Sequence, residues 1–159
     1  MLAKPQAVEF KEVDVQSLIN QLVLLMEIQG ILNNVQIESV IDSSIPAIHC
    51  DMNQMKQVLI NLLKNSIEPM PKGGSISLRV QQADEHYIRI TIEDEGEGIP
   101  PERLSRLGEP FYSLKEKGTG LGIMICQRII REHHGELRFH SVVNEGTTVE
   151  ILLPIQQGK

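Results

Sequence analysis

The segment from residue 51 to residue 68 limits the possible folds more than any other part of the chain, because it reads as one long helix with two different faces. Asp51 can cap its first turn, and Gln54 stands three residues later, where it completes the pattern of a capping box. Pro69 and Pro71 mark its end, since proline cannot continue a helix. These signals predict a helix with clear limits, around which the rest of the fold is arranged.

The two faces of this helix differ in chemistry. At about 3.6 residues per turn, polar side chains fall on one narrow seam and apolar side chains on the other side. A solvated surface is one explanation of the seam, but asparagine in the middle of a helix costs propensity, and two asparagines one turn apart suggest a task. An asparagine oxygen is a hard, neutral ligand that suits Mg²⁺ already carrying nucleotide phosphates. The seam is Gln54, Gln57, Asn61, Asn65 and Glu68, and the apolar side is Met52, Met55, Leu59, Leu62 and Leu63.

Composition sets the class of protein. The chain has 159 residues, of which 41% are hydrophobic, so we expect one globular domain with a substantial core. A net charge of -6 disfavours binding to nucleic acid or to an anionic membrane. Cys50 and Cys126 lie far apart in the sequence with no paired spacing, which indicates reduced, buried thiols in a cytosolic setting. We expect no signal peptide and no membrane-spanning segment.

The remaining elements alternate irregularly between helices and hairpins. We expect a packing helix over 17–33, with Leu18, Leu22, Leu25, Met26 and Ile28 on its apolar face. This order predicts an α/β (α+β) two-layer sandwich, with a mixed, largely antiparallel sheet of about five strands and three helices on one face. The expected strands are 9–13, 35–39, 75–80, 86–93, 136–141 and 147–153, with an extended lead at 48–50, a helical turn at 102–107 and a helix over 119–134 closed by Gly135.

A glycine-rich motif, Gly118-Thr119-Gly120-Leu121-Gly122, opens the last helix. Backbone N–H groups and the helix dipole at such a start favour an anion, and glycine allows a phosphate to approach closely. A flexible hinge is the alternative. The spacing matches neither the dinucleotide fingerprint nor the GxxxxGK[ST] loop.

An acidic motif, Asp94-x-Gly96-x-Gly98, follows a strand that alternates strictly between isoleucine and polar residues. A carboxylate at the end of such a strand is partly desolvated and can accept a hydrogen bond from an amino group such as that of adenine. An acidic surface turn is the alternative.

The segment between these two motifs holds Phe111, Tyr112, Lys115 and Lys117. The aromatic residues could form a lid over a ligand or anchor a loop to the core. The lysines could screen phosphate charge or remain a solvated pair. The histidines show no spacing typical of metal ligands, so we expect no histidine metal site.

Taken together, Asn61/Asn65, Asp94-x-Gly96-x-Gly98, Phe111, the 118–122 motif and Gly146-Thr147-Thr148 closely resemble the N, G1, F, G2 and G3 boxes of one family. That family is the catalytic, ATP-binding domain of bacterial sensor histidine kinases, with the Bergerat ATP-binding fold. The resemblance covers residues 9 to 155, and its finer features are similar to the sporulation kinases of Bacillus-type bacteria.

The resemblance implies a set of functional residues. Asn65 would bind Mg²⁺, Asn61 would support the phosphates or the water shell of the metal, and Asp94 would read the adenine amino group with Thr147 nearby. Asn61, Asn65 and Lys115 would serve catalysis. The remaining nucleotide-binding positions would be Gly96, Gly98, Ile99, Phe111, Lys115, Lys117, Gly118, Thr119, Gly120, Leu121 and Gly122.

One position separates the reactions of the wider superfamily. Gyrase-type and mismatch-repair ATPases place a water-activating glutamate four residues before the metal-binding asparagine. Asn61 stands there in this chain and cannot act as a base. The resemblance therefore implies transfer of the γ-phosphate of ATP to a protein histidine, rather than hydrolysis. A regulatory module that binds ATP without transferring it, and a stand-alone ATPase, remain as alternatives, although Asn61 argues against the second.

None of the five histidines has the sequence context of the family's phosphoacceptor. We therefore expect residues 1–8 to be a linker from an upstream dimerisation and phosphoacceptor helix, residues 9–156 to be the catalytic domain and residues 157–159 to be a tail. The expected partners are ATP, the dimerisation domain of the same kinase and a response regulator. We expect a cytoplasmic domain with no direct membrane contact, whether or not the parent kinase is membrane-anchored.

Overall fold

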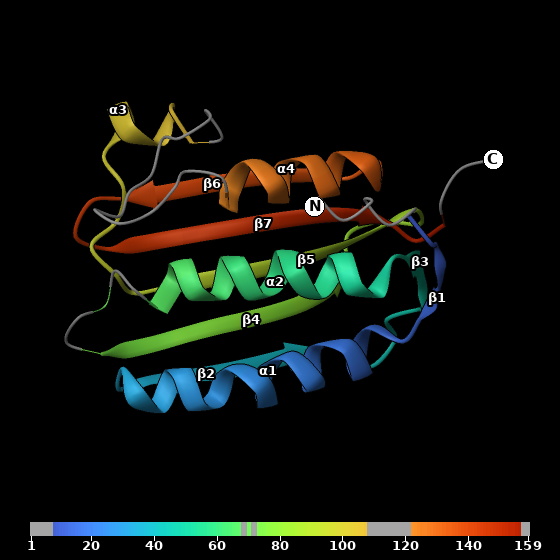
Figure 1. Cartoon of the computed structure of the whole chain (residues 1–159), viewed down its shortest axis with the longest axis horizontal. Helices are drawn as coiled ribbons and strands as arrows, with labels where there is room; N and C mark the ends of the chain where they lie inside the picture. Colours follow the sequence, from blue (N-terminus) through green and yellow to red (C-terminus); the bar gives the residue numbers. More distant parts are fainter. Residues whose placement is uncertain (1–7, 68–69, 71–72, 108–121, 157–159) are drawn as a thin grey trace, which may run out of the picture.

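A computed structural model describes residues 8–67, 70, 73–107 and 122–156. Its helices and strands follow the expected order (Figure 1). They are β1 (Lys11–Val13), α1 (Val15–Leu32), β2 (Val35–Ile41), β3 (Ile48–Cys50), α2 (Met52–Ile67), β4 (Gly74–Gln82), β5 (Tyr87–Asp94), α3 (Pro101–Leu104), α4 (Gly122–Glu132), β6 (Glu136–Val142) and β7 (Gly146–Pro154).

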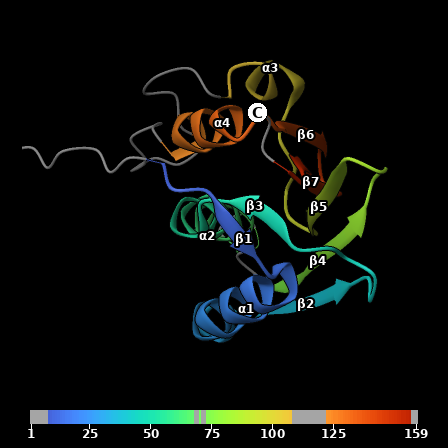
Figure 2. The same cartoon turned by 90° about the vertical axis from the view of Figure 1, so that its right-hand side faces the viewer.

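Five of the described strands form one sheet in the order β2-β4-β5-β7-β6. Only the β2–β4 pair among them is parallel. Figure 2 shows α1, α2 and α4 on one face of this sheet, so the predicted two-layer α/β sandwich is confirmed. β1 and β3 pair separately as a short antiparallel ribbon. Along β5 every second side chain is buried, which places Asp94 on the helix-covered face with the three isoleucines before it.

α2 lies over the middle of the sheet, and its buried face supplies a large part of the core. The predicted cap is present, because Asp51 Oδ1 accepts the Gln54 backbone N–H at 3.1 Å. The reciprocal half of the predicted capping box is wrong. The Asp51 backbone N–H donates to Nε2 of His133 at 3.0 Å, while the buried Gln54 Oε1 has no hydrogen-bond partner among the described residues. A contact distant in sequence has therefore replaced a local one.

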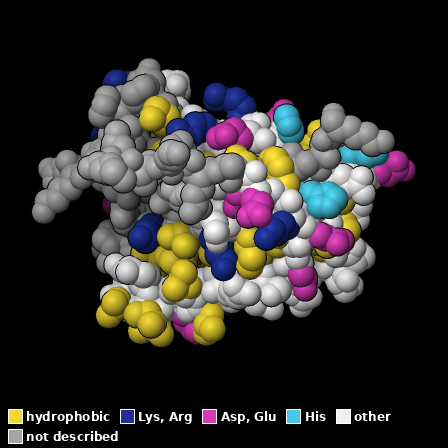
Figure 3. Space-filling view, turned by 45° about the vertical axis from the view of Figure 1, so that its right-hand side comes forward, with side chains coloured by type: hydrophobic (Ala, Val, Ile, Leu, Met, Phe, Trp, Pro, Cys, Tyr) yellow, Lys and Arg dark blue, Asp and Glu magenta, His cyan; other side chains and the backbone are white. Residues whose placement is uncertain are grey.

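α1 packs on the sheet through one face only. Leu18, Leu22 and Met26 are buried as predicted, whereas Leu25 and Ile28 are 60% and 68% exposed, so the prediction that they pack into the core is wrong. Figure 3 shows hydrophobic side chains along the lower edge of the molecule, where α1 lies. The exposed members on α1 are Leu24, Leu25, Ile28, Ile31 and Leu32.

The buried and the exposed apolar side chains together account for the high hydropathy of α1. By length and composition it could cross a membrane, yet a third of the window that meets this test (33%) is buried in the fold. A mostly buried core helix meets the same test, and so does a signal sequence near the N-terminus.

The last helix also ends differently from the prediction. α4 stops at Glu132, and His134 adopts the left-handed conformation (φ 61°) that a closing glycine would usually take. Gly135 is required for another reason: a Cβ there would lie 2.2 Å from the carbonyl oxygen of Leu152. The glycine thus permits close packing on β7.

Candidate nucleotide site

The polar seam of α2 faces α4 at Asn61. Asn61 Nδ2 lies 3.9 Å from the Cys126 sulfur, and that sulfur lies 3.8 Å from the carbonyl oxygen of Val58. Burial raises the pKa of the Cys126 thiol to about 11, so the sulfur keeps its proton at neutral pH. Asn61 and Asn65 are both half-buried, one turn apart. The seam is therefore partly enclosed between two helices.

Asp94 ends β5 and is only 5% exposed. Its Oδ1 accepts the backbone N–H of Gly96 at 2.9 Å and that of Thr147 at 3.1 Å, and the Ser66 side chain is also hydrogen-bonded to the carboxyl. Burial raises the pKa of the Asp94 carboxyl above its usual range, and these three hydrogen bonds partly offset the rise. The alternative of an acidic surface turn is excluded by this burial.

Two glycines, one in the acidic motif and one at the start of β7, allow backbones to meet where a side chain would not fit. Gly98 has φ 77°, and a Cβ there would lie 2.3 Å from the carbonyl oxygen of Val142. Gly146 has φ 135°, and a Cβ there would lie 2.1 Å from the carbonyl oxygen of Asp94. Both positions are thus restricted to glycine by conformation and by space.

A serine that the sequence analysis did not single out joins the strands on the far side of Asp94. Ser141 of β6 lies opposite Thr147 of β7, and their hydroxyl oxygens are 2.9 Å apart. Ser141 Oγ also accepts the Ile99 backbone N–H at 2.6 Å. The predicted turn at residues 144–146 sets the register of the two strands, so the sequence carried a signal from which the pairing of Ser141 with Thr147 could have been predicted. Ser66, by contrast, had no local signal.

The structure therefore brings several predicted residues to one end of the sheet. Ser66 links the C-terminal turn of α2, which also carries Asn65, to the Asp94 carboxyl, so the asparagine seam and the acidic motif are neighbours. Gly122 begins α4. Gly96 and Thr147 contact the Asp94 carboxyl directly, and Gly146 lies against its backbone carbonyl. Ile99 is linked to Thr147 through Ser141, and Gly98 lies against Val142. The other predicted positions, Phe111, Lys115, Lys117, Gly118, Thr119, Gly120 and Leu121, lie outside the described residues, as do Glu68, Pro69 and Pro71.

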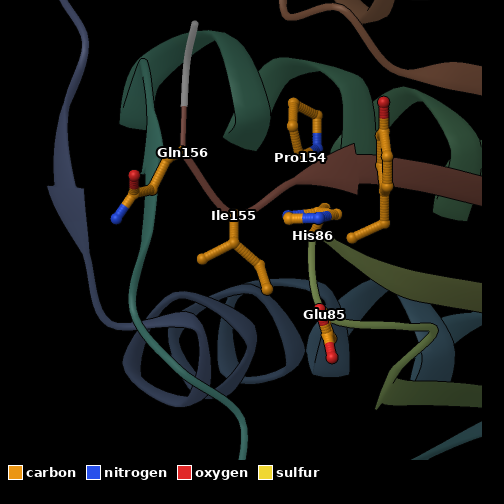
Figure 4. Close-up of a pocket in the computed structure, with 6 residues that line it drawn as sticks. Glu85, His86, Pro154, Ile155 and Gln156 are labelled. Carbon is orange, nitrogen blue, oxygen red and sulfur yellow. The ribbon is translucent and has the colours of Figure 1, made fainter.

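A separate cavity of about 360 Å³ lies at the opposite end of β5 and β7 (Figure 4). It is lined by the end of the β4–β5 hairpin and the residues that follow β7: Glu85, His86, Tyr87, Pro154, Ile155 and Gln156. Tyr87 and Asp94 are the two ends of β5, roughly 23 Å apart at the usual rise of a strand. This cavity is therefore distinct from the predicted nucleotide site.

Comparison with known proteins agrees with this geometry. The family described as "Histidine kinase-, DNA gyrase B-, and HSP90-like ATPase" matches residues 50–157. Sporulation kinase E of Bacillus subtilis (strain 168) is 45% identical over 99% of this chain, which corresponds to 21% of that kinase. The chain thus spans about a fifth of that relative.

Two solved structures share the fold. The catalytic domain of histidine kinase ThkA superposes with a TM-score of 0.84 at 29% identity, covering 94% of this chain and 97% of that one. Histidine kinase ThkA in complex with the response regulator TrrA superposes with a TM-score of 0.79 at 26% identity, covering 93% of this chain and 42% of that one. The chain belongs to the histidine kinase-, DNA gyrase B- and HSP90-like ATPase family, and within it to the ATPase domains of sensor histidine kinases.

Proposed function

We propose that this domain binds Mg²⁺-ATP and transfers the γ-phosphate to a histidine on the dimerisation domain of a two-component sensor kinase, from which a response regulator receives it. The observation that carries the proposal is the pair Asn61 and Asn65, half-buried on α2 next to the enclosed carboxylate of Asp94. Asn61 is an amide in contact with Cys126 and cannot take a proton from water. This favours phosphoryl transfer over hydrolysis.

We assign Asp94 to recognition of the adenine base of the nucleotide. Its Oδ1 is already held by two backbone N–H groups, so the carboxylate is fixed before a ligand arrives. An adenine amino group would donate to it in a site with little water, where an unpaired partner costs about 1–3 kcal/mol. Thr147, Gly96, Gly98 and Ile99 would form the walls around the base.

Asn65 is the residue that we assign to the metal. The described residues contain no group of three or more His, Cys, Asp or Glu that could hold an ion. A neutral amide oxygen fits an ion whose other ligands are phosphate oxygens and waters, which is the usual coordination of Mg²⁺ on a nucleotide. When bound, the ion neutralises phosphate charge during transfer. Asn61, one turn earlier, would hold the phosphates or the waters around the ion.

The segment between α3 and α4 would close the phosphate side. We assign Phe111, Lys115, Lys117 and residues 118–121 to this role, with Gly122 at the start of α4. Glycine-rich backbone at a helix start suits an anion, and the lysines add positive charge. Lys115 would also serve catalysis by screening the transferred phosphoryl group.

The surrounding protein is also part of the proposal. Residues 1–8 would link this domain to a dimerisation helix that carries the acceptor histidine, residues 9–156 would be the catalytic unit, and residues 157–159 a tail. Alone, the unit would bind ATP without phosphorylating itself. The named kinase relatives and the complex of a kinase with a response regulator support these partners. The domain would work in the cytoplasm without touching the membrane.

Transfer in trans tests the proposal. The chain is mixed with Mg²⁺, γ-labelled ATP and a separately produced acceptor-helix domain, and both protein-bound label and free phosphate are followed. We expect acid-labile, base-stable label on the acceptor with little free phosphate. Free phosphate alone would identify an ATPase, and bound ATP without either product would identify a binding module.

Asn65→Asp is the matched variant for this test, because it keeps the size of the side chain while changing one metal ligand from neutral to charged. We expect it to lose most of the transfer and to keep the melting temperature of the unaltered chain. Unchanged transfer would remove Asn65 from the site.

A further inference from the structure

The hydroxyl of Ser141 touches three groups in two segments near Asp94, the loop after the acidic motif and the start of β7. Its oxygen lies 2.6 Å from the backbone nitrogen of Ile99, 3.0 Å from the carbonyl oxygen of Gly146 and 2.9 Å from the hydroxyl oxygen of Thr147. Ile99 follows the acidic motif, and Gly146 and Thr147 begin β7, next to β6 in the sheet (Figure 1). One side chain thus joins the loop and both strands at this end of the sheet.

The direction of each hydrogen bond follows from the chemistry of the partners. A hydroxyl has one hydrogen to donate and two lone pairs to accept with. The backbone N–H of Ile99 can only donate, and the carbonyl of Gly146 can only accept. Ser141 therefore gives its single hydrogen to Gly146. Its contact with Thr147 is then a hydrogen bond in which Thr147 donates. If Ser141 donated to Thr147 instead, its only hydroxyl hydrogen would no longer be available for the hydrogen bond to the Gly146 carbonyl.

This assignment fixes what Thr147 can offer to a ligand. Its hydroxyl hydrogen points to Ser141, so only lone pairs remain on its oxygen. The other hydroxyl beside Asp94, that of Ser66, is hydrogen-bonded to the carboxyl itself. Among the described side chains that contact Asp94, Ser141 or Thr147 in these networks, no hydroxyl hydrogen is left for a nucleobase. The pocket therefore presents acceptors at this position.

We propose that Ser141 is a specificity-determining positioning residue, which withholds the Thr147 hydrogen and thereby favours 6-amino purines over 6-oxo purines. A 6-amino group brings hydrogens that the Asp94 carboxylate can accept. A 6-oxo group brings a second acceptor, and it could be compensated only by a donor such as a released Thr147 hydroxyl. The proposal rests on nucleotide binding as proposed above and assigns part of its selectivity to a residue that does not touch the base.

The test measures the affinities of the chain for ATP and GTP, each with Mg²⁺, by calorimetry. We expect Ser141→Ala to lower the ratio of ATP affinity to GTP affinity by about five-fold or more, which corresponds to about 1 kcal/mol, because Thr147 can then donate to a 6-oxo group. Ser141→Thr keeps the hydroxyl and should keep the ratio. Ser39→Ala, an exposed serine on β2, is the matched control and should also keep it.

A second mutation separates this role from general support of the pocket. In a Thr147→Val background there is no hydroxyl hydrogen to release, so adding Ser141→Ala should leave the affinity ratio unchanged. The proposal is overturned if Ser141→Ala weakens both nucleotides equally, or if its effect on the ratio persists with valine at position 147. Failure of the unaltered chain to bind either nucleotide would overturn the proposed function, and this inference with it. An unchanged ratio of ATP affinity to GTP affinity in Ser141→Ala, with both nucleotides still bound by the unaltered chain, would overturn the inference alone.

Discussion

Replacing Asp94 with asparagine should weaken ATP binding and stabilise the ligand-free fold at the same time. The amide is nearly the same size as the carboxylate. Its oxygen can still accept the backbone N–H groups of Gly96 and Thr147, and its NH₂ can donate to the Ser66 hydroxyl. The network of the ligand-free protein is therefore kept. The change affects recognition of the nucleobase: where the carboxylate offers an acceptor to the nucleobase, the amide offers an NH₂ donor.

The loss of affinity follows from that change. An adenine amino group would face an NH₂ group in an enclosed site, and a buried polar group without its partner costs about 1–3 kcal/mol. At about 1.4 kcal/mol per factor of ten, Asp94→Asn should weaken ATP binding by about five-fold to 150-fold. GTP should lose less or gain, because the new NH₂ can donate to its 6-oxo group.

The gain in stability follows from the pKa of Asp94. Burial raises it in the folded protein, so the folded state holds the proton more readily than the unfolded state does. Above this raised pKa, ionisation of Asp94 lowers the free energy of unfolding. That penalty disappears as the pH falls through the raised value toward the ordinary value of 3.8. Asp94→Asn removes the penalty, so the variant should melt higher than the unaltered chain at neutral pH and lose this advantage in acid.

Calorimetry with ATP and GTP, and thermal melting without nucleotide at several pH values, measure both effects. Asp42→Asn makes the same chemical change in an exposed turn and serves as the control. ATP affinity equal to that of the unaltered chain would refute the assignment of Asp94 to the base. A lower melting temperature at neutral pH would refute the argument that its burial costs stability.

Two further perturbations test the framework around the site. Gly98→Ala should lower the free energy of unfolding by at least about 1–2 kcal/mol in denaturant titrations, because φ 77° and the Val142 carbonyl oppose a side chain. Gly122→Ala should not destabilise, because a Cβ there would meet no heavy atom of the described residues within 4 Å outside its own helix and its chain neighbours. Equal losses of stability in the two variants would contradict the argument that Gly98 is strained by a side chain. Burial lowers the pKa of His133, so the folded state binds a proton less readily than the unfolded state does. The free energy of unfolding that neutral His133 contributes should therefore be complete above about pH 6.5 and fall in acid, by at most about 1.4 kcal/mol per pH unit. His133→Gln keeps an acceptor for Asp51 and should flatten that slope in pH-dependent unfolding; an unchanged slope would show that His133 does not titrate on unfolding.

The sequence predicted the features that depend on neighbouring residues. The cap at Asp51, the alternation that buries Asp94 and the turn before Gly146 are all set by residues within a few positions of one another. Such signals were enough for the order of the elements and for the two-layer fold. They also identified the acidic motif, because a carboxylate after a buried strand is desolvated wherever the rest of the chain lies.

Features that depend on distant packing were not predictable. The Asp51 N–H has two possible acceptors, and only the position of α4 makes His133 the partner in place of Gln54. The spacing of Leu25 and Ile28 is helical, but it does not reveal that the sheet covers only one face of α1. Ser66 became part of the site because α2 ends beside β5. In each case the deciding neighbour is far away in the sequence.

These distant contacts show that α2 and α4 support each other at one end and carry proposed nucleotide-binding residues at the other. α2 and α4 run in opposite directions, since the start of α2 meets the end of α4 through Asp51 and His133, and Asn61 meets Cys126 farther along both helices. The hydrogen bond at Asp51 is enclosed and pairs two helix ends, so it holds this end of the pair together. The opposite end carries Asn65 and Gly122. About four turns of α2 separate Asn65 from the hydrogen bond at Asp51, so a substitution at either end should act on one of these roles and leave the other in place.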